Sequence, residues 1–130
     1  MREIKFRVWN PENKKMSMVG AIDWDMYYKV ITCNTKDEKM YKLGHKDLDF
    51  ILMQYTGLKD KNGTEIYEGD LLFSSDWCCN CEVIWEDGGF TLKEGETIYN
   101  LKENLTDDDG NYLDDVKVIG NIYENKELIK

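Results

Sequence analysis

The sequence predicts a mainly β protein, and three observations support that class. Short segments that alternate apolar with polar residues recur at roughly the 8- to 12-residue spacing of all-β domains. Glycine, asparagine and aspartate gather between these segments, where tight turns need residues that tolerate positive φ. No long segment has the 3.6-residue apolar period of an amphipathic helix. Many short strands joined by such turns are typical of a small barrel or sandwich.

The first predicted element is a β-hairpin over residues 1–19. Ile4, Phe6 and Val8 alternate with Lys5, Arg7 and Trp9, a period of two that points one face of a strand inward. Residues 10–13 supply turn chemistry, since Pro11 fixes φ and asparagine tolerates positive φ. Met16 and Met18 then resume the alternation, so this segment should pair with itself.

The next part of the chain is also expected to be extended. Residues 22–41 are rich in β-branched and aromatic side chains, which favours strands with a polar turn at 34–38. The run 50–55 is predicted to enter a buried strand, with one helical turn over 45–52 as the alternative.

Three turns organise the middle of the chain. Asn62-Gly63 supplies the positive φ values of a tight type I′ turn and predicts a hairpin or closely folded loop. Residues 68–70 form a second turn before the apolar segment 71–73. Residues 86–89 form a third turn, between two further strands.

The last third of the chain contains an acidic segment. Residues 103–115 include six acidic and no basic side chains, which predicts an open, solvated loop. A final strand is predicted around residues 116–119. Residues 121–129 fit either a short helical turn or an extended tail.

The charge of the chain is unevenly distributed. The net charge is −9, which argues against general phosphate binding and against direct binding to nucleic acid. Residues 1–46 contain ten basic and six acidic side chains, a net charge of +4, whereas residues 47–130 contain seven basic and twenty acidic, a net charge of −13. This division fits either a solvated surface or attraction between the halves of neighbouring subunits.

Composition also predicts where the chain resides. No stretch approaches the roughly 20 apolar residues of a membrane helix, and the first residues do not form a secretory signal. The four cysteines are unevenly spaced, unlike a secreted disulfide scaffold: Cys33, Cys78, Cys79 and Cys81. We therefore expect a protein of a reducing cytoplasm that makes no contact with a membrane.

Catalytic and metal-binding patterns are weak. The one histidine, His45, has no serine or cysteine near it in sequence, and no glycine-rich phosphate loop occurs. Asp107-x-Asp109 resembles part of a calcium loop but lacks its first and last ligands. Cys78 and Cys81 form one CxxC, for which Cys33 and His45 are distant zinc partners, and free cysteines are the favoured reading. We predict no catalytic, cofactor-binding or metal-binding residue and folding without metal.

Aromatic residues gather around the central hairpins and have two interpretations. They can build the core, or they can line a groove that binds a peptide. They are Tyr55, Tyr67, Trp77, Trp85 and Phe90.

Three blocks of sequence carry a resemblance to a known family. They read MREIKFRVW at 1–9, MQYTGLKDKNG at 53–63 continued by EIYEGD at 65–70, and VIGNIYEN at 118–125. This pattern resembles the YopX-like family of phage and prophage proteins. The resemblance implies a mainly β fold with an SH3-like barrel, a phage or prophage origin and self-assembly into a homo-oligomer. It implies no activity and no catalytic residues.

Within the longest block, the residues also have a purely structural interpretation. Gly57, Gly63 and Gly69 permit turns that a Cβ would strain, because glycine adopts positive φ freely. Leu58, Ile66 and Leu71 are predicted to supply core.

Together these observations predict one domain over 1–130, an all-β, SH3-like small barrel with an additional N-terminal hairpin. Residues 1–46 form the N-terminal hairpin and strands, and residues 47–130 form the barrel, with the acidic loop at 103–115. The predicted function is a non-enzymatic, self-assembling accessory module that binds a host or phage protein. The alternative is an acidic DNA mimic that inhibits a DNA-processing enzyme. Charge pairing between copies is expected to join Lys5, Arg7, Lys14 and Lys15 to Asp107, Asp108, Asp109, Asp114 and Asp115. Apolar contact from Trp9 or from an exposed strand edge is expected to supply most of the affinity.

Overall fold

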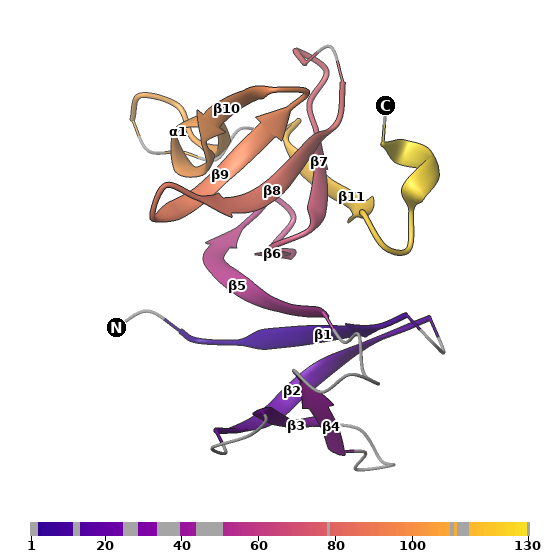
Figure 1. Ribbon diagram of the computed structural model, residues 1–130. Helices are drawn as coiled ribbons and strands as arrows, with labels where there is room; N and C mark the ends of the chain where they lie inside the picture. Colours follow the sequence, from indigo (N-terminus) through magenta and orange to yellow (C-terminus); the bar gives the residue numbers. More distant parts are fainter. Residues whose placement is uncertain are drawn as a thin grey trace. The chain divides into compact units, whose positions relative to one another are not determined.

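The computed structural model describes residues 3–11, 14–24, 29–33, 40–43, 51–77, 79–109, 111 and 115–129 (Figure 1). The chain divides into two compact units. The N-terminal unit is Ile4–Gln54, and the C-terminal unit is Met1–Glu3 with Tyr55–Lys130. Strands predominate in the described parts of both, so the predicted mainly β class is confirmed.

The N-terminal unit contains β1 (Phe6–Asn10), β2 (Lys15–Trp24), β3 (Lys29–Cys33), β4 (Met40–Leu43) and the first residues of β5 (Ile51–Lys59). These strands are antiparallel in the order β4-β3-β2-β1-β5. The predicted hairpin is confirmed, with Arg7 opposite Met18 and Asn10 opposite Lys15. The strands predicted over 22–41 are confirmed as well. The turn predicted at 34–38 lies outside the described residues.

Strand β1 is buried on both of its faces, which the alternation did not predict. Two adjacent residues of this strand, Val8 and Trp9, are 1% and 7% exposed, whereas Ile4, which precedes the strand, is 67% exposed. Adjacent residues of a strand point to opposite faces, so both faces are covered here. The expectation that Trp9 supplies apolar contact between copies is therefore wrong, because its side chain is buried within the chain. β1 is an inner strand: Trp9 lies opposite Met16 of β2 on one edge and Ile51 of β5 on the other.

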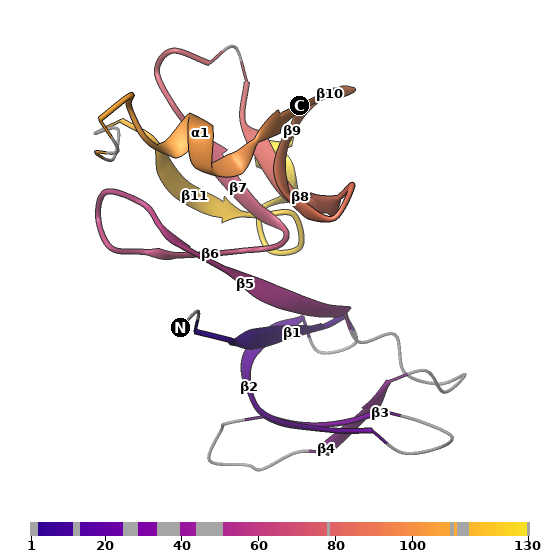
Figure 2. The same ribbon diagram turned by 90° about the vertical axis from the view of Figure 1, so that its left-hand side faces the viewer.

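The C-terminal unit contains an antiparallel five-stranded sheet in the order β10-β9-β8-β7-β11 (Figures 1 and 2). Its strands are β7 (Asp70–Phe73), β8 (Cys81–Glu86), β9 (Gly89–Glu94), β10 (Thr97–Asn100) and β11 (Lys117–Asn121). The later part of β5 pairs separately with β6 (Glu65–Tyr67). Among the described strands, β10 and β11 each have one unpaired edge, so the sheet does not close. The SH3-like barrel is therefore not confirmed.

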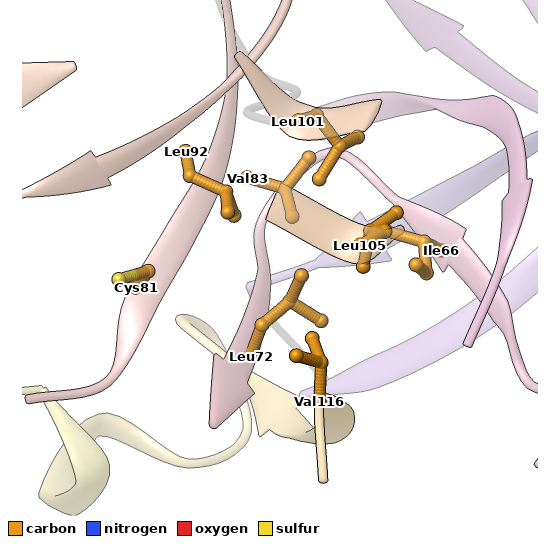
Figure 3. Packing of buried hydrophobic residues seen from close by; sticks show 8 residues of the cluster. All are labelled: Ile66, Leu72, Cys81, Val83, Leu92, Leu101, Leu105 and Val116. Carbon is orange, nitrogen blue, oxygen red and sulfur yellow. The ribbon is translucent and has the colours of Figure 1, made fainter. Parts of the chain in front are cut away.

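The core of the C-terminal unit forms where the sheet meets the short helix α1 (Leu101–Leu105) (Figure 3). Leu101 and Leu105 are four residues apart, so they share one face of the helix, and that face points into the cluster. The other buried members are Ile66, Leu72, Cys81, Val83, Leu92 and Val116. Among the predicted core residues, Ile66 and Leu71 are buried and Leu58 packs against the cluster half-buried.

The turn at Asn62-Gly63 is not of type I′. Gly63 has φ +84°, but Asn62 does not have positive φ, which a type I′ turn requires at both central residues. The Asp60 carboxylate determines this turn instead: its Oδ1 accepts from the backbone N–H of Asn62 and of Thr64, each at 2.9 Å. The type I′ values occur at the third predicted turn, where Asp87 and Gly88 have φ +54° and +81°.

The acidic segment begins in a helix, so the loop prediction is wrong for residues 103–105. Asn100 caps α1, because its Oδ1 accepts from the Glu103 backbone N–H at 3.0 Å. After the helix, Asp107, Asp108 and Asp109 are exposed and lie outside helices and strands, as the loop prediction requires, and residues 110 and 112–114 lie outside the described part. The chain ends in a 3-10 helix, η1 (Lys126–Leu128), which agrees with the helical alternative for 121–129.

Candidate functional site

The residues singled out from sequence do not converge on a catalytic or metal centre in the described part of the chain. His45, Cys78 and the side chain of Cys33 lie outside it. Neither Cys79 nor Cys81 forms a disulfide bond. Within the described ranges, no three histidine, cysteine or acidic side chains are placed so that they could hold one metal ion.

The Asp107-x-Asp109 pattern has a local structural role. Oδ1 of Asp107 accepts from the backbone N–H of Asp109 and of Asn111, each at 2.9 Å. These bonds close an aspartate-capped turn on the surface, with Asp107, Asp108 and Asp109 all exposed. The Asp107 carboxylate thus shapes the loop.

A cleft of about 300 Å³ opens in the C-terminal unit, at the end of the sheet where β8 begins and β9 ends. We call it the β8–β10 cleft. Two of its lining residues are buried, Cys81 and Leu92. The others surround them and are more accessible: Asp76, Trp77, Glu94, Tyr99 and Asn104.

Strand register brings these side chains together. Leu92 of β9 lies opposite Val83 of β8 and Tyr99 of β10, so all three point to the core face of the sheet. Cys81 lies two residues before Val83 in β8 and Glu94 two residues after Leu92 in β9, so both share that face. The apolar core of the unit thus continues into the cleft, and a carboxylate and a phenol stand at its margin.

The loop after β7 is fixed by a serine. Ser74 is buried; its Oγ accepts from the Asp76 backbone N–H at 3.2 Å, and its carbonyl accepts from the Trp77 N–H at 3.1 Å. Ser74 Oγ also donates to Asp115 Oδ2 at 3.0 Å, and Ser75 Oγ donates to the same oxygen at 2.6 Å. The bonds from Ser75 and then Ser74 lower the pKa of Asp115. This network positions Asp76 and Trp77 on the cleft wall.

Some polar groups of the cleft have hydrogen-bond partners and others do not. Asn104 Nδ2 donates to the Asn100 carbonyl at 2.7 Å. The carboxylates of Asp76 and Glu94 have neither an ion-pair nor a hydrogen-bond partner among the described residues. Burial, followed by the nearby charges of Glu94 and Cys79, raises the pKa of Cys81 to about 11. The thiol therefore stays protonated at neutral pH and is a poor nucleophile.

The predicted aromatic cluster divides between the two interpretations. Tyr55 and Tyr67 are buried, with ring centroids 5.4 Å apart, and belong to the core. Trp85 is 53% exposed and packs edge-on against Phe90, with centroids 4.8 Å apart. Trp77 lines the cleft.

The N-terminal unit has a hollow of a different kind. A groove of about 550 Å³ runs along β1 and β2, and its lining is mainly apolar. Its large apolar side chains are the exposed Ile4 and Met18 and the half-buried Phe6, Val19 and Ile22. Among the described residues that line it, Lys5 alone is charged.

Comparison with known proteins establishes the family. The model of the family described as YopX protein matches residues 5–130. The chain belongs to the YopX family. A crystal structure of protein EF1440 from Enterococcus faecalis is similar, with a TM-score of 0.67, 27% sequence identity and coverage of 100% of each chain. No curated protein shows significant similarity.

The family assignment confirms the resemblance in the three sequence blocks and assigns no active site. Of the cleft residues in this YopX-family chain, sequence reasoning singled out only Trp77 and Cys81. The other five come from β9, β10, α1 and the loop after β7, and only strand pairing brings them together. No helix in the described ranges is long and apolar enough to cross a bilayer.

Charge differs strongly between the two units of this YopX-family chain. The N-terminal unit contains nine basic and seven acidic side chains, a net charge of +2. The C-terminal unit contains eight basic and nineteen acidic side chains, a net charge of −11. The division seen in the sequence thus follows the division into compact units.

Proposed function

We propose that this YopX-family chain is a non-enzymatic accessory protein, encoded by a phage or prophage, that binds other protein chains in the cytoplasm. Its partners include further copies of itself. The observation that carries the proposal is the separation of charge between two compact units, +2 in one and −11 in the other. Such a pair of surfaces attracts a complementary chain and favours one orientation of binding.

Apolar contact supplies the affinity in this proposal, because exposed ion pairs contribute only about 0 to 1 kcal/mol each. Several large apolar side chains of the five-stranded sheet are at least one third exposed: Phe73, Trp85, Ile98 and Tyr99. Aromatic residues are the commonest anchors of protein interfaces. The finer fold also belongs to this proposal: β5 and β6, with Ile66 in the same core as the sheet, would form an open variant of an SH3-like barrel.

Sedimentation velocity tests the proposal. We expect a homo-oligomer at micromolar concentration that loosens, without full dissociation, as salt rises, since salt screens charge and leaves apolar burial in place. The double variant Lys14→Glu/Lys15→Glu should weaken assembly, whereas the control Lys126→Glu, also at an exposed lysine, should not. A chain that stays strictly monomeric over this range would contradict self-assembly.

The charge of the C-terminal unit favours one second candidate, an acidic DNA mimic that blocks the basic site of a DNA-processing enzyme. Capture of partners from lysogenic cells separates the two. Enrichment of a DNA-processing enzyme that DNA competitively releases would favour the mimic. Enrichment of a phage structural protein, unaffected by DNA, would favour the assembly module.

A further inference from the structure

We propose that the β8–β10 cleft binds a single cationic side chain, lysine or arginine, presented by a partner protein chain. The inference rests on the proposed function and names the chemistry of the partner. Two observations carry it: the cleft holds two carboxylates with no ion-pair partner in the described ranges, and two aromatic rings line the same hollow.

The carboxylates come from different elements. Asp76 lies on the serine-fixed loop after β7, and Glu94 ends β9. Both line one cavity, so a cation placed inside meets both negative groups, and the net charge of −11 on this unit adds to the attraction. The same charges repel phosphate and carboxylate ligands.

The aromatic rings select the same class of ligand. Trp77 and Tyr99 line the cavity with the carboxylates, and the faces of indole and phenol rings attract ammonium and guanidinium groups. Trp77 is held half-buried against the core, while Tyr99 is 41% exposed at the margin. The rings are therefore available to a group that enters from outside.

The apolar bottom fits the stem of such a side chain. Leu92 and the protonated thiol of Cys81 are buried there and carry no charge at neutral pH. Lysine and arginine have methylene stems that pack on apolar surface while the charged head reaches polar groups. A volume of about 300 Å³ is at the lower limit of ligand pockets, which suits one side chain.

The test uses the full chain and two short peptides, acetyl-Gly-Ser-Lys-Ser-Gly-amide and its counterpart with glutamine in place of lysine. Binding is followed by the shift of the Trp77 indole N–H signal in ¹H–¹⁵N spectra, assigned with Trp77→Phe. We expect the lysine peptide to shift this signal with a Kd of about 1 mM, as a single-residue contact would give. Equal shifts from the glutamine peptide would overturn the proposal.

Matched charge variants locate the site. Glu94→Gln removes a carboxylate from the cleft, and Glu96→Gln removes one from an exposed position in the turn between β9 and β10 that does not line it. We expect Glu94→Gln to raise the Kd about ten-fold and Glu96→Gln to raise it less than about two-fold. Equal weakening by both would mean that only the general negative charge attracts the peptide, and would overturn the proposal.

A second variant tests the aromatic contribution, so that the test does not depend on Glu94 alone. Tyr99→Leu keeps apolar bulk at an exposed position but removes the aromatic face, so the preference for lysine over glutamine should fall about three-fold. An unchanged preference in a folded variant would contradict the aromatic contribution. Sedimentation of the same samples separates the two proposals: an assembling wild-type chain with no lysine preference refutes the cleft alone, and a monomer that prefers lysine refutes self-assembly alone.

Discussion

Replacing Asp60 with alanine should destabilise the chain more than any comparable change at the surface. Asp60 is 3% exposed, and its carboxylate accepts three backbone hydrogen bonds. Oδ1 holds Asn62 and Thr64 in the adjacent turn, and Oδ2 accepts from the Val118 N–H of β11 at 3.1 Å. One side chain thus fixes a turn and ties it to a strand 58 residues away in sequence.

The size of this destabilisation follows from the three backbone N–H donors that lose their acceptor when Asp60 is replaced. A part-buried donor without a partner costs about 1 kcal/mol or more, so three such donors predict a loss of about 3 to 4 kcal/mol in the free energy of unfolding. The chain contains a matched control in Asp107. Its Oδ1 accepts from residues two and four further on, also at 2.9 Å, but at an exposed site and with no third bond to a distant strand.

Comparing the urea unfolding of Asp60→Ala with that of Asp107→Ala therefore measures how much burial and the bond to Val118 add to the free energy of unfolding. We expect Asp107→Ala to lose only about 0.5 to 1 kcal/mol, because water reaches the freed N–H groups. Asp60→Asn should fall between, since it can keep the turn and lose the Val118 bond. The reasoning is refuted if the two alanine variants differ by less than about 1 kcal/mol.

The remaining predictions concern a turn and a thiol. Gly63→Val should lower the free energy of unfolding by about 1 to 3 kcal/mol, because Gly63 has φ +84°, which a β-branched residue tolerates poorly. The effect would come from the backbone alone, since no atom lies within 4 Å of a Cβ added there. Gly89→Val, also in open space but without positive φ, is the control in thermal melts. Equal melting temperatures would mean that the assigned turn geometry is wrong. Because burial raises the pKa of Cys81 from 9.0 to about 11, the folded chain retains a proton that the unfolded chain loses, so stability should fall as pH rises from about 9 to about 11. Cys81→Ala should remove that part of the pH dependence in urea titrations, and an unchanged slope would contradict it.

Local chemistry made much of the fold predictable. The turn at Asp87-Gly88 and the hairpin of β1 and β2 depend on residues that are neighbours in sequence, so their side chains alone indicate them. The capped helix α1 also had a local signal, an asparagine followed by leucines at helical spacing. The acidic charges of residues 103–115 predicted a loop there and gave no indication of this helix.

What could not be predicted depends on distant parts of the chain. The type I′ assignment failed at Asn62-Gly63 because the Asp60 side chain bonds to the turn and, through its second oxygen, to Val118. The position of β1 as an inner strand depends on β5, about forty residues further along, which pairs with its second edge. The β8–β10 cleft depends on the pairing of three strands, and no spacing in the sequence encodes it.

The segment after β11 folds against itself through a compact set of asparagine bonds. Asn121 Oδ1 accepts from the backbone N–H of Tyr123 and of Glu124, while Asn125 Oδ1 accepts from the Asn121 N–H at 3.1 Å. The Asn125 side chain occupies the space that a Cβ on Gly120 would need.

These three positions therefore cannot drift independently during evolution. A side chain at position 120 requires the Asn125 side chain to move away or to become smaller, and either change removes the acceptor that the Asn121 N–H uses. Homologues that depart from glycine at position 120 should then carry a paired change at 125, with a rearranged chain end. The block 118–125 would in that case be inherited as one unit, because its residues constrain one another's shape.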